Sequence, residues 1–267
     1  MELLFLISGI VVIVLVTIDF LITTLRMGGG GFISSLVSKG LWNMIFFIAK
    51  KNAKSPLLSI AGFLILIKLI TTWLLLIWLG FSLIYLSDTN SVLETSNKIP
   101  TDTVGNIYFV GYILSSLGNG DLMAGSDFWR ILTNLMSFYG FFFITLTITY
   151  ILPVLDAAIK KRTLSAYIYQ LGKNPVEILK NGWNGENFDM LYDQFKSMHT
   201  LVLDHTERHL AYPILHYFHS QHPKYAAPLT LAILDETINI QEVYQFDKST
   251  AAYNWKILRH SIDAYLE

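Results

Sequence analysis

The sequence has no cysteine and little charge. None of its 267 residues is Cys, which excludes a disulfide framework and a thiolate metal site. Charged residues make up 15% of the chain and 53% of residues are hydrophobic, whereas ordinary soluble domains carry about 25% charge. The net charge is −1 and no long basic run is present, so we expect no nucleic-acid partner. These shortages argue against a fully soluble enzyme.

The few charges are also unevenly distributed along the chain. Residues 1–153 hold eight Lys or Arg and seven Asp or Glu, which leaves eleven and thirteen for the shorter segment 154–267. We therefore expect a membrane half and a water-soluble half that join at about Pro153.

Three apolar runs are long enough to cross a bilayer as helices. They are Met1–Leu25, Leu57–Leu86 and Phe128–Leu152. A cleavable signal peptide is the alternative for the first run, but a basic start and a small-x-small cleavage site are both missing. Asp19 and Lys68 are costly in such runs, so we expect either an ion pair between them or a Lys68 amine that extends to the headgroups.

The loops between the runs indicate how the chain is oriented. Residues 26–54 contain five basic residues and no acid, which predicts a cytoplasmic loop. The N-terminus is then outside and the C-terminal part inside, in a multi-pass protein of a microbial inner membrane. Apolar residues spaced by three or four between Gly31 and Pro56 predict a helix that lies in the inner interface.

A shorter apolar segment, Val104–Leu117, lies between the second and third runs. Its roughly 14 residues are too few to cross a bilayer, and Gly118-Asn119-Gly120-Asp121 follows directly. A short helix that enters a membrane and returns as non-helical backbone needs protein or water around it, which is the geometry of a pore loop. Glycines at alternate positions let successive carbonyls face one axis and replace the hydration shell of a cation, and Ser116 adds a hydroxyl oxygen. The alternative is a glycine-containing turn in an ordinary membrane anchor.

The run S-L-G-N-G-D, preceded by Tyr108 and Phe109 and followed by a long helix, resembles the pore of the prokaryotic potassium-channel superfamily, whose signature is T-V-G-Y-G-D. The resemblance implies an outer helix at 57–86, an inner helix at 128–152 and a selectivity filter formed by Ser116, Leu117, Gly118, Asn119, Gly120 and Asp121. It also implies a homotetramer, because a ring of carbonyls needs several equivalent strands. Permeant potassium is the expected ion, with no other cofactor.

Two positions depart from the family's pattern. Asn119 replaces a tyrosine that packs against the aromatics of the pore helix in the family, so selectivity for potassium over sodium is an open question. Tyr112 stands where some members have a glutamate, and we expect it to hydrogen-bond to Asp121.

One stripe of the inner helix is expected to line the pathway and to close it by dewetting. Its residues are Gly140, Ile144, Thr147, Ile151 and Leu155. Gly140 stands 20 positions after Gly120, where the family places its hinge, although close helix packing explains a glycine there equally well.

The segment after Lys160 has helical periodicity throughout and contains all seven histidines. His205 and His209 are spaced to share one helix face, where they would chelate a metal or sense protons. A tetramerisation or partner-docking domain is the simpler interpretation.

The expected protein is therefore an all-α membrane protein with three transmembrane helices, a re-entrant pore helix and filter, and a cytoplasmic helical domain. Its domains are 1–55, 56–153 and 154–267. We expect a homotetrameric cation channel in the lipid bilayer and no enzyme. The alternatives are a membrane-anchored metal-binding enzyme or sensor that uses the cytoplasmic histidines, and a subunit that partners another channel protein.

Overall fold

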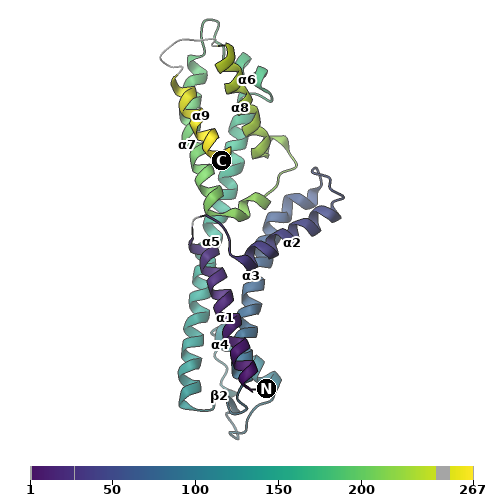
Figure 1. The fold of residues 1–267 in the computed structure, drawn as a ribbon, viewed down its shortest axis with the longest axis vertical. Coiled ribbons are helices and arrows are strands. Elements are labelled where there is room, and N and C mark those ends of the chain that lie inside the picture. The colour runs from purple at the N-terminus through teal and green to yellow at the C-terminus, as the bar shows by residue number, and fades with distance from the viewer. Residues whose placement is uncertain (1, 27, 245–252, 267) are drawn as a thin grey trace. The chain divides into compact units, whose positions relative to one another are not determined.

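The computed structural model describes residues 2–26, 28–244 and 253–266 (Figure 1). The chain is mostly helical, at 78%, and three of its helices are long and apolar enough to cross a membrane. These are α1 (Glu2–Leu25), α3 (Pro56–Tyr85) and α5 (Asp127–Leu171). The chain divides into two compact units, one of residues 1–26, 30–39 and 66–152, the other of residues 27–29, 40–65 and 153–267.

In the first unit, α1 and α3 pack closely because glycines meet at their contact. A Cβ at Gly9 would lie 2.6 Å from the carbonyl oxygen of Gly80. Small residues of this kind let two helix backbones approach within a membrane. Phe20 of α1 then packs against Trp73 of α3 and Phe143 of α5, with ring centroids 5.0 and 4.8 Å apart. These contacts join the three long helices.

Asp19 connects α1 to the start of α2 (Phe32–Ile48), and its partners differ from the predicted one. The Asp19 carboxylate accepts hydrogen bonds from the backbone N–H of Ile33 at 2.7 Å, the Ser34 hydroxyl at 2.5 Å and the Trp73 indole N–H at 2.9 Å. The predicted ion pair with Lys68 is therefore wrong, and Lys68 is exposed. The physical reason is that the free N–H groups at a helix N-terminus supply what a buried carboxylate needs.

Two short strands and a short helix lie between α3 and α5. Strands β1 (Val92–Glu94) and β2 (Leu122–Ala124) pair antiparallel, with Leu93 opposite Met123. Helix α4 (Thr103–Leu114) has 12 residues and begins at an Asp102 cap, whose carboxylate accepts from the Gly105 N–H. The apolar segment predicted at 104–117 is thus helical only as far as Leu114.

Helix α5 continues well beyond the predicted end of the third span. It has 45 residues, and Pro153 lies inside it. The extension is stabilised because Leu164 and Ile168 are buried in the core of the second unit. The second half of the chain therefore begins within α5 rather than with a linker.

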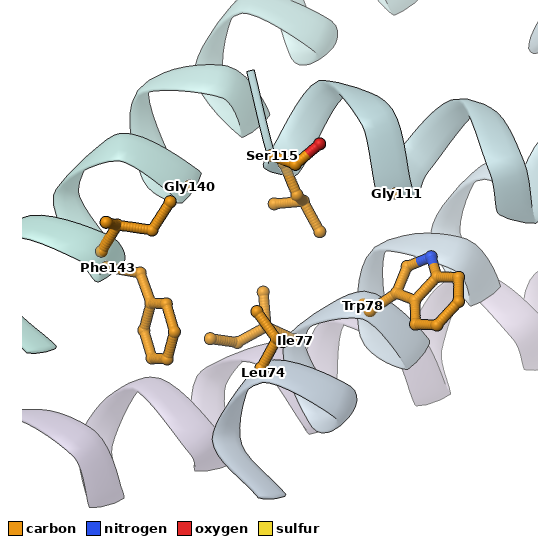
Figure 2. A pocket seen from close by; sticks show the side chains of 9 residues that line it. Leu74, Ile77, Trp78, Gly111, Ser115, Gly140 and Phe143 are labelled. Carbon is orange, nitrogen blue, oxygen red and sulfur yellow. The ribbon is translucent and has the colours of Figure 1, made fainter. Parts of the chain in front are cut away.

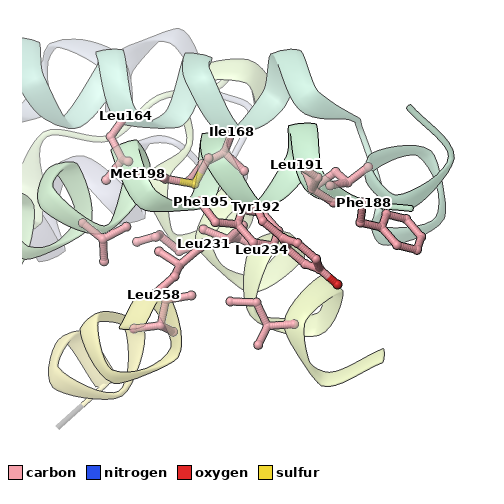
Figure 3. Packing of buried hydrophobic residues seen from close by; sticks show 14 residues of the cluster. Leu164, Ile168, Phe188, Leu191, Tyr192, Phe195, Met198, Leu231, Leu234 and Leu258 are labelled. Atoms are coloured by element: carbon pink, nitrogen blue, oxygen red, sulfur yellow. The ribbon is translucent and has the colours of Figure 1, made fainter. Parts of the chain in front are cut away.

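The core of the second unit gathers side chains from α5 and four further helices. These are α6 (Pro175–Gly182), α7 (Asp189–Ala211), α8 (Ala227–Tyr244) and α9 (Tyr253–Leu266), and two 3₁₀ turns, η1 (Pro213–Tyr217) and η2 (Pro223–Tyr225), precede α8. Figure 3 shows Phe195, Met198, Leu231 and Leu258 packed against one another. The predicted helical character of this half agrees with these elements.

Candidate functional site

The segment that carries the predicted filter starts and ends against the same pair of strands. Before α4, the Thr101 N–H donates to the Val92 carbonyl at 3.1 Å. After it, the Thr95 N–H donates to the Asp121 carbonyl at 2.9 Å, and β2 follows at once. The chain therefore leaves the pair of strands β1 and β2 as a helix and returns to it as non-helical backbone within about twenty residues.

Helix α4 ends in a left-handed cap at Ser116, whose φ is +58°. The Leu117 N–H donates to the Tyr112 carbonyl at 2.9 Å and the Ser116 N–H to the Ile113 carbonyl at 3.0 Å. These two bonds define a Schellman motif, a common way to satisfy the last carbonyls of a helix. Ser116, predicted as the first residue of the filter, thus also terminates the helix.

Residues 115–121 are exposed throughout. Gly118 has a φ of +65°, which glycine adopts without steric cost, and in the described chain no atom lies within 4 Å of a Cβ built at Gly118 or Gly120. The backbone predicted to line an ion path is therefore uncovered within one chain.

Two tyrosines of α4 hold the returning backbone. The side-chain amide of Asn119 donates to the Tyr108 hydroxyl. The Tyr112 hydroxyl donates to the Leu122 carbonyl at 3.1 Å, and not to the Asp121 carboxylate as expected. A backbone carbonyl accepts this bond because Leu122 begins the strand that passes beside α4. Asn119 therefore lacks the aromatic packing that the tyrosine provides at this position in the potassium-channel superfamily. It is instead held to α4 by a hydrogen bond.

Gly140 of α5 lies directly against the C-terminal end of α4. A Cβ at Gly140 would lie 2.3 Å from the Leu114 carbonyl oxygen, and α5 is helical on both sides of it. An apolar cavity of about 280 Å³ opens next to this contact, with Leu74, Ile77 and Phe143 directed into it (Figure 2). The role that the structure assigns to Gly140 is close packing.

The other predicted pathway residues of α5 fall on two faces. Thr147 is buried and donates its hydroxyl to the Phe143 carbonyl of its own helix at 2.8 Å. Ile144 and Leu155 are exposed, and Ile151 is half-buried. The uncovered face of α5 also contains large apolar residues that the predicted stripe omits: Phe141, Ile148 and Leu152.

Of the two histidines predicted to share a face of α7, His205 is buried and His209 is half-buried. His205 is 2% exposed, neither of its ring nitrogens has a hydrogen-bond partner among the described residues, and its ring lies 5.8 Å from that of His209. Burial, together with the nearby Lys161 ammonium, lowers the pKa of each histidine to about 4. Among the described residues, no group of three or more His, Asp or Glu is placed to hold a metal ion.

Sequence reasoning did not find the groups that position α4. The Trp78 indole of α3 donates to the Ile107 carbonyl at 2.9 Å, and Gly111 gives it room, since a Cβ there would be 3.2 Å from the Trp78 nitrogen. The available signals were a tryptophan in a mainly aliphatic span and a glycine within a short helix.

The chain resembles a known protein over almost its whole length. It is 35% identical to the uncharacterized membrane protein YdjJ of Bacillus subtilis (strain 168) over 269 residues, which cover 98% of this chain and 77% of that protein. The chain belongs to the YdjJ family. It is thus a membrane protein with several candidate spans. No protein-family model matches it, and no solved structure matches it.

Proposed function

We propose that the chain forms a homotetrameric pore-loop cation channel that conducts potassium. The observation that carries the proposal is the path of residues 101–121, which leave the ribbon of β1 and β2 and return to it. A 12-residue helix is too short to cross a bilayer, so a segment with both ends on one ribbon suits a re-entrant loop.

The local backbone suits ion coordination between Leu117 and Gly120. This stretch is exposed, and open space surrounds Gly118 and Gly120 within the described chain. Bare peptide oxygens in such a stretch replace the water of a cation when several copies face one axis. Each chain has one copy, which is why the proposal requires a tetramer.

The Asn119–Tyr108 hydrogen bond supports a filter whose width is set by α4. Because this single bond replaces aromatic packing, we propose that potassium is conducted with weaker discrimination against sodium than in the family that the segment resembles.

The uncovered face of α5 supplies the pathway on the cytoplasmic side of this filter. Phe141, Ile144, Ile148 and Leu152 are exposed and recur at three to four residues. Apolar rings from four copies form a constriction that stops ions by dewetting. We propose that the helical domain beyond Pro153 gates this constriction, since α5 runs into its core without a break.

We propose that residues 26–54 form a cytoplasmic loop and that the N-terminus lies outside the inner membrane, because the loop has five basic residues and no acid. Helix α2 exposes the large apolar residues Phe32, Leu36 and Phe47, which suits a helix embedded in the inner interface.

The test is reconstitution of the purified chain in liposomes with separate potassium and sodium gradients. We expect cation flux in both, faster for potassium, and a mass of four chains in the detergent complex. A monodisperse reconstituted protein without flux in either gradient contradicts the proposal.

A further inference from the structure

A second cavity lies within the second unit, and Leu155 is the one residue of the predicted pathway stripe that lines it. Its volume is about 500 Å³, and its lining comes from α3, α5 and the segment from Phe218 to Tyr225. It contains both apolar and cationic side chains, unlike the apolar cavity beside Gly140.

The cavity lies where both of its long helices change from apolar to polar. On α5, Leu155 and Ile159 line it and are 37% and 64% exposed, and Lys160, Lys161 and Arg162 follow without a gap. On α3, Ser59 lines it in the first turns of the helix, between the exposed apolar residues Leu57 and Ile60. Exposed apolar side chains next to such a change mark the depth of lipid headgroups.

The polar part of the lining is cationic and held in place. Lys161 is only 8% exposed, and its ammonium donates to the carbonyls of Leu215 at 2.9 Å and Phe218 at 3.2 Å. Because an ammonium has three N–H groups, these two bonds fix its position and leave one donor without a partner in the part of the chain that the structure describes. Burying a charge is costly, so a fixed cation in a cavity wall favours an anionic occupant.

Arg162 provides a second cation at the same wall. Its guanidinium lies over the Tyr225 ring at 4.5 Å, and the Lys224 ammonium is 5.4 Å from the same ring. Stacking on one face leaves the N–H groups in the guanidinium plane free for a bidentate anion. The described lining also includes His219, His222 and Ser220, and it includes no Asp or Glu.

We propose that this cavity binds the phosphate-bearing headgroup of an anionic phospholipid from the adjacent leaflet. Lys161 and Arg162 contact the phosphate, and Leu155, Ile159 and Phe218 contact the glycerol and the first methylenes. A soluble phosphate ester offers the same phosphate chemistry, but it leaves the exposed Ile159 uncovered. The lipid satisfies both halves of the lining.

The neighbouring Lys160 is a natural control because it carries the same charge on another face of α5. Its ammonium lies 3.7 Å from Asp156 and 3.8 Å from Asp204, so its charge is already compensated. Arg162→Gln and Lys160→Gln therefore remove the same charge two positions apart, and only the first removes a group from the cavity.

The test uses the full-length chain in a neutral detergent and does not depend on ion conduction. Binding of phosphatidylglycerol, phosphatidylcholine, glycerol phosphate and inorganic phosphate is measured by native mass spectrometry and by the shift in the melting temperature. We expect phosphatidylglycerol to bind about tenfold more tightly than phosphatidylcholine, which is the effect of one charge-assisted contact. Arg162→Gln removes this preference, and Lys160→Gln retains it.

The results distinguish a phospholipid site from a site for soluble phosphate and from no site at all. Loss of the preference in Arg162→Gln at an unchanged melting temperature without lipid supports it. Equal effects of the two substitutions, or equal binding of the two lipids, overturns it. Binding of glycerol phosphate or inorganic phosphate without a preference for phosphatidylglycerol overturns the lipid assignment and leaves a soluble phosphate as the ligand.

Discussion

The carbonyl oxygen of Leu114 occupies the space that a side chain at residue 140 would need. A Cβ at Gly140 would be 2.3 Å from this oxygen, well inside any real contact. The end of α4, and with it the start of the proposed filter, is therefore positioned by the absence of a side chain on α5.

Gly140→Ala is expected to displace α4 and to abolish cation flux. Overpacking of this kind costs roughly 1–3 kcal/mol, which should appear as a lower melting temperature. Gly40→Ala on α2 is the matched control, because no atom lies within 4 Å of a Cβ there. If Gly140→Ala conducts like the wild type, the contact has no role in positioning the filter.

Asp19→Asn is expected to destabilise the membrane half strongly. The carboxylate accepts from Ile33, Ser34 and Trp73, and an amide cannot accept from all of them. Leaving buried donors unsatisfied costs about 1–3 kcal/mol each, so the melting temperature should fall by many degrees.

Lys68→Gln separates this explanation from an ion pair. Lys68 is exposed, so its substitution is expected to leave the melting temperature unchanged. Equal destabilisation by Asp19→Asn and Lys68→Gln would instead support an ion pair between Asp19 and Lys68.

Tyr108→Phe removes the hydroxyl that accepts from Asn119 without changing the ring. We expect the fold to persist and the ratio of potassium to sodium flux to fall, because the filter loses its polar link to α4. Tyr139→Phe is the control, since it removes a hydroxyl that pairs with Thr17 of α1 at 2.7 Å rather than with a filter residue. An unchanged flux ratio in Tyr108→Phe means that this bond does not set the filter's width.

The buried histidines predict acid sensitivity of the helical domain. The pKa of His205 is about 4 in the folded chain, because of burial first and of Lys161 and His209 next, while Asp204 acts in the opposite direction. Its ordinary value of 6.5 applies when the chain unfolds. The unfolded state then binds more protons between about pH 6.5 and 4, so stability is complete above pH 6.5 and is lost on acidification.

The full loss for His205 is on the order of 3 kcal/mol and is reached below about pH 4, so melting temperatures measured from pH 8 to pH 5 should reveal about 2 kcal/mol of it. His205→Leu is expected to flatten the profile, whereas the exposed His222→Gln is not. A profile for His205→Leu as steep as the wild type's assigns the acid sensitivity to other groups. Buried histidines that stay neutral above pH 6 also make poor proton sensors near neutrality.

The sequence predicted the helices better than the contacts between them. The length and periodicity of the apolar runs predicted α1, α3 and the start of α5, because residues that face the core or the lipid are mostly apolar. The same reasoning ended the third span at Leu152, since it could not know that Leu164 and Ile168 pack into a later core. An ion pair with Lys68 was one of the two alternatives for Asp19, because backbone N–H groups, which are among its partners, cannot be identified from residue type.

Around the candidate site, the residue types indicated a short helix and a glycine-rich return but not their caps. Ser116 caps the end of α4 in a left-handed conformation, which serine adopts rarely. Gly140 fits both a hinge and a close contact by sequence, and only the position of Leu114 favours the second. Contacts between segments far apart in the chain decide such cases.

The most direct test of the account is the potassium flux of Gly118→Ala in liposomes, beside Gly185→Ala. Both glycines have a positive φ and open space around them, and Gly185 lies in the helical domain. Alanine at a positive φ costs roughly 1–2 kcal/mol of backbone strain, so both proteins should fold. If ions pass along the backbone of residues 117–120, Gly118→Ala loses potassium flux and Gly185→Ala keeps it. Wild-type flux through a folded Gly118→Ala protein would contradict the claim that ions pass along this backbone.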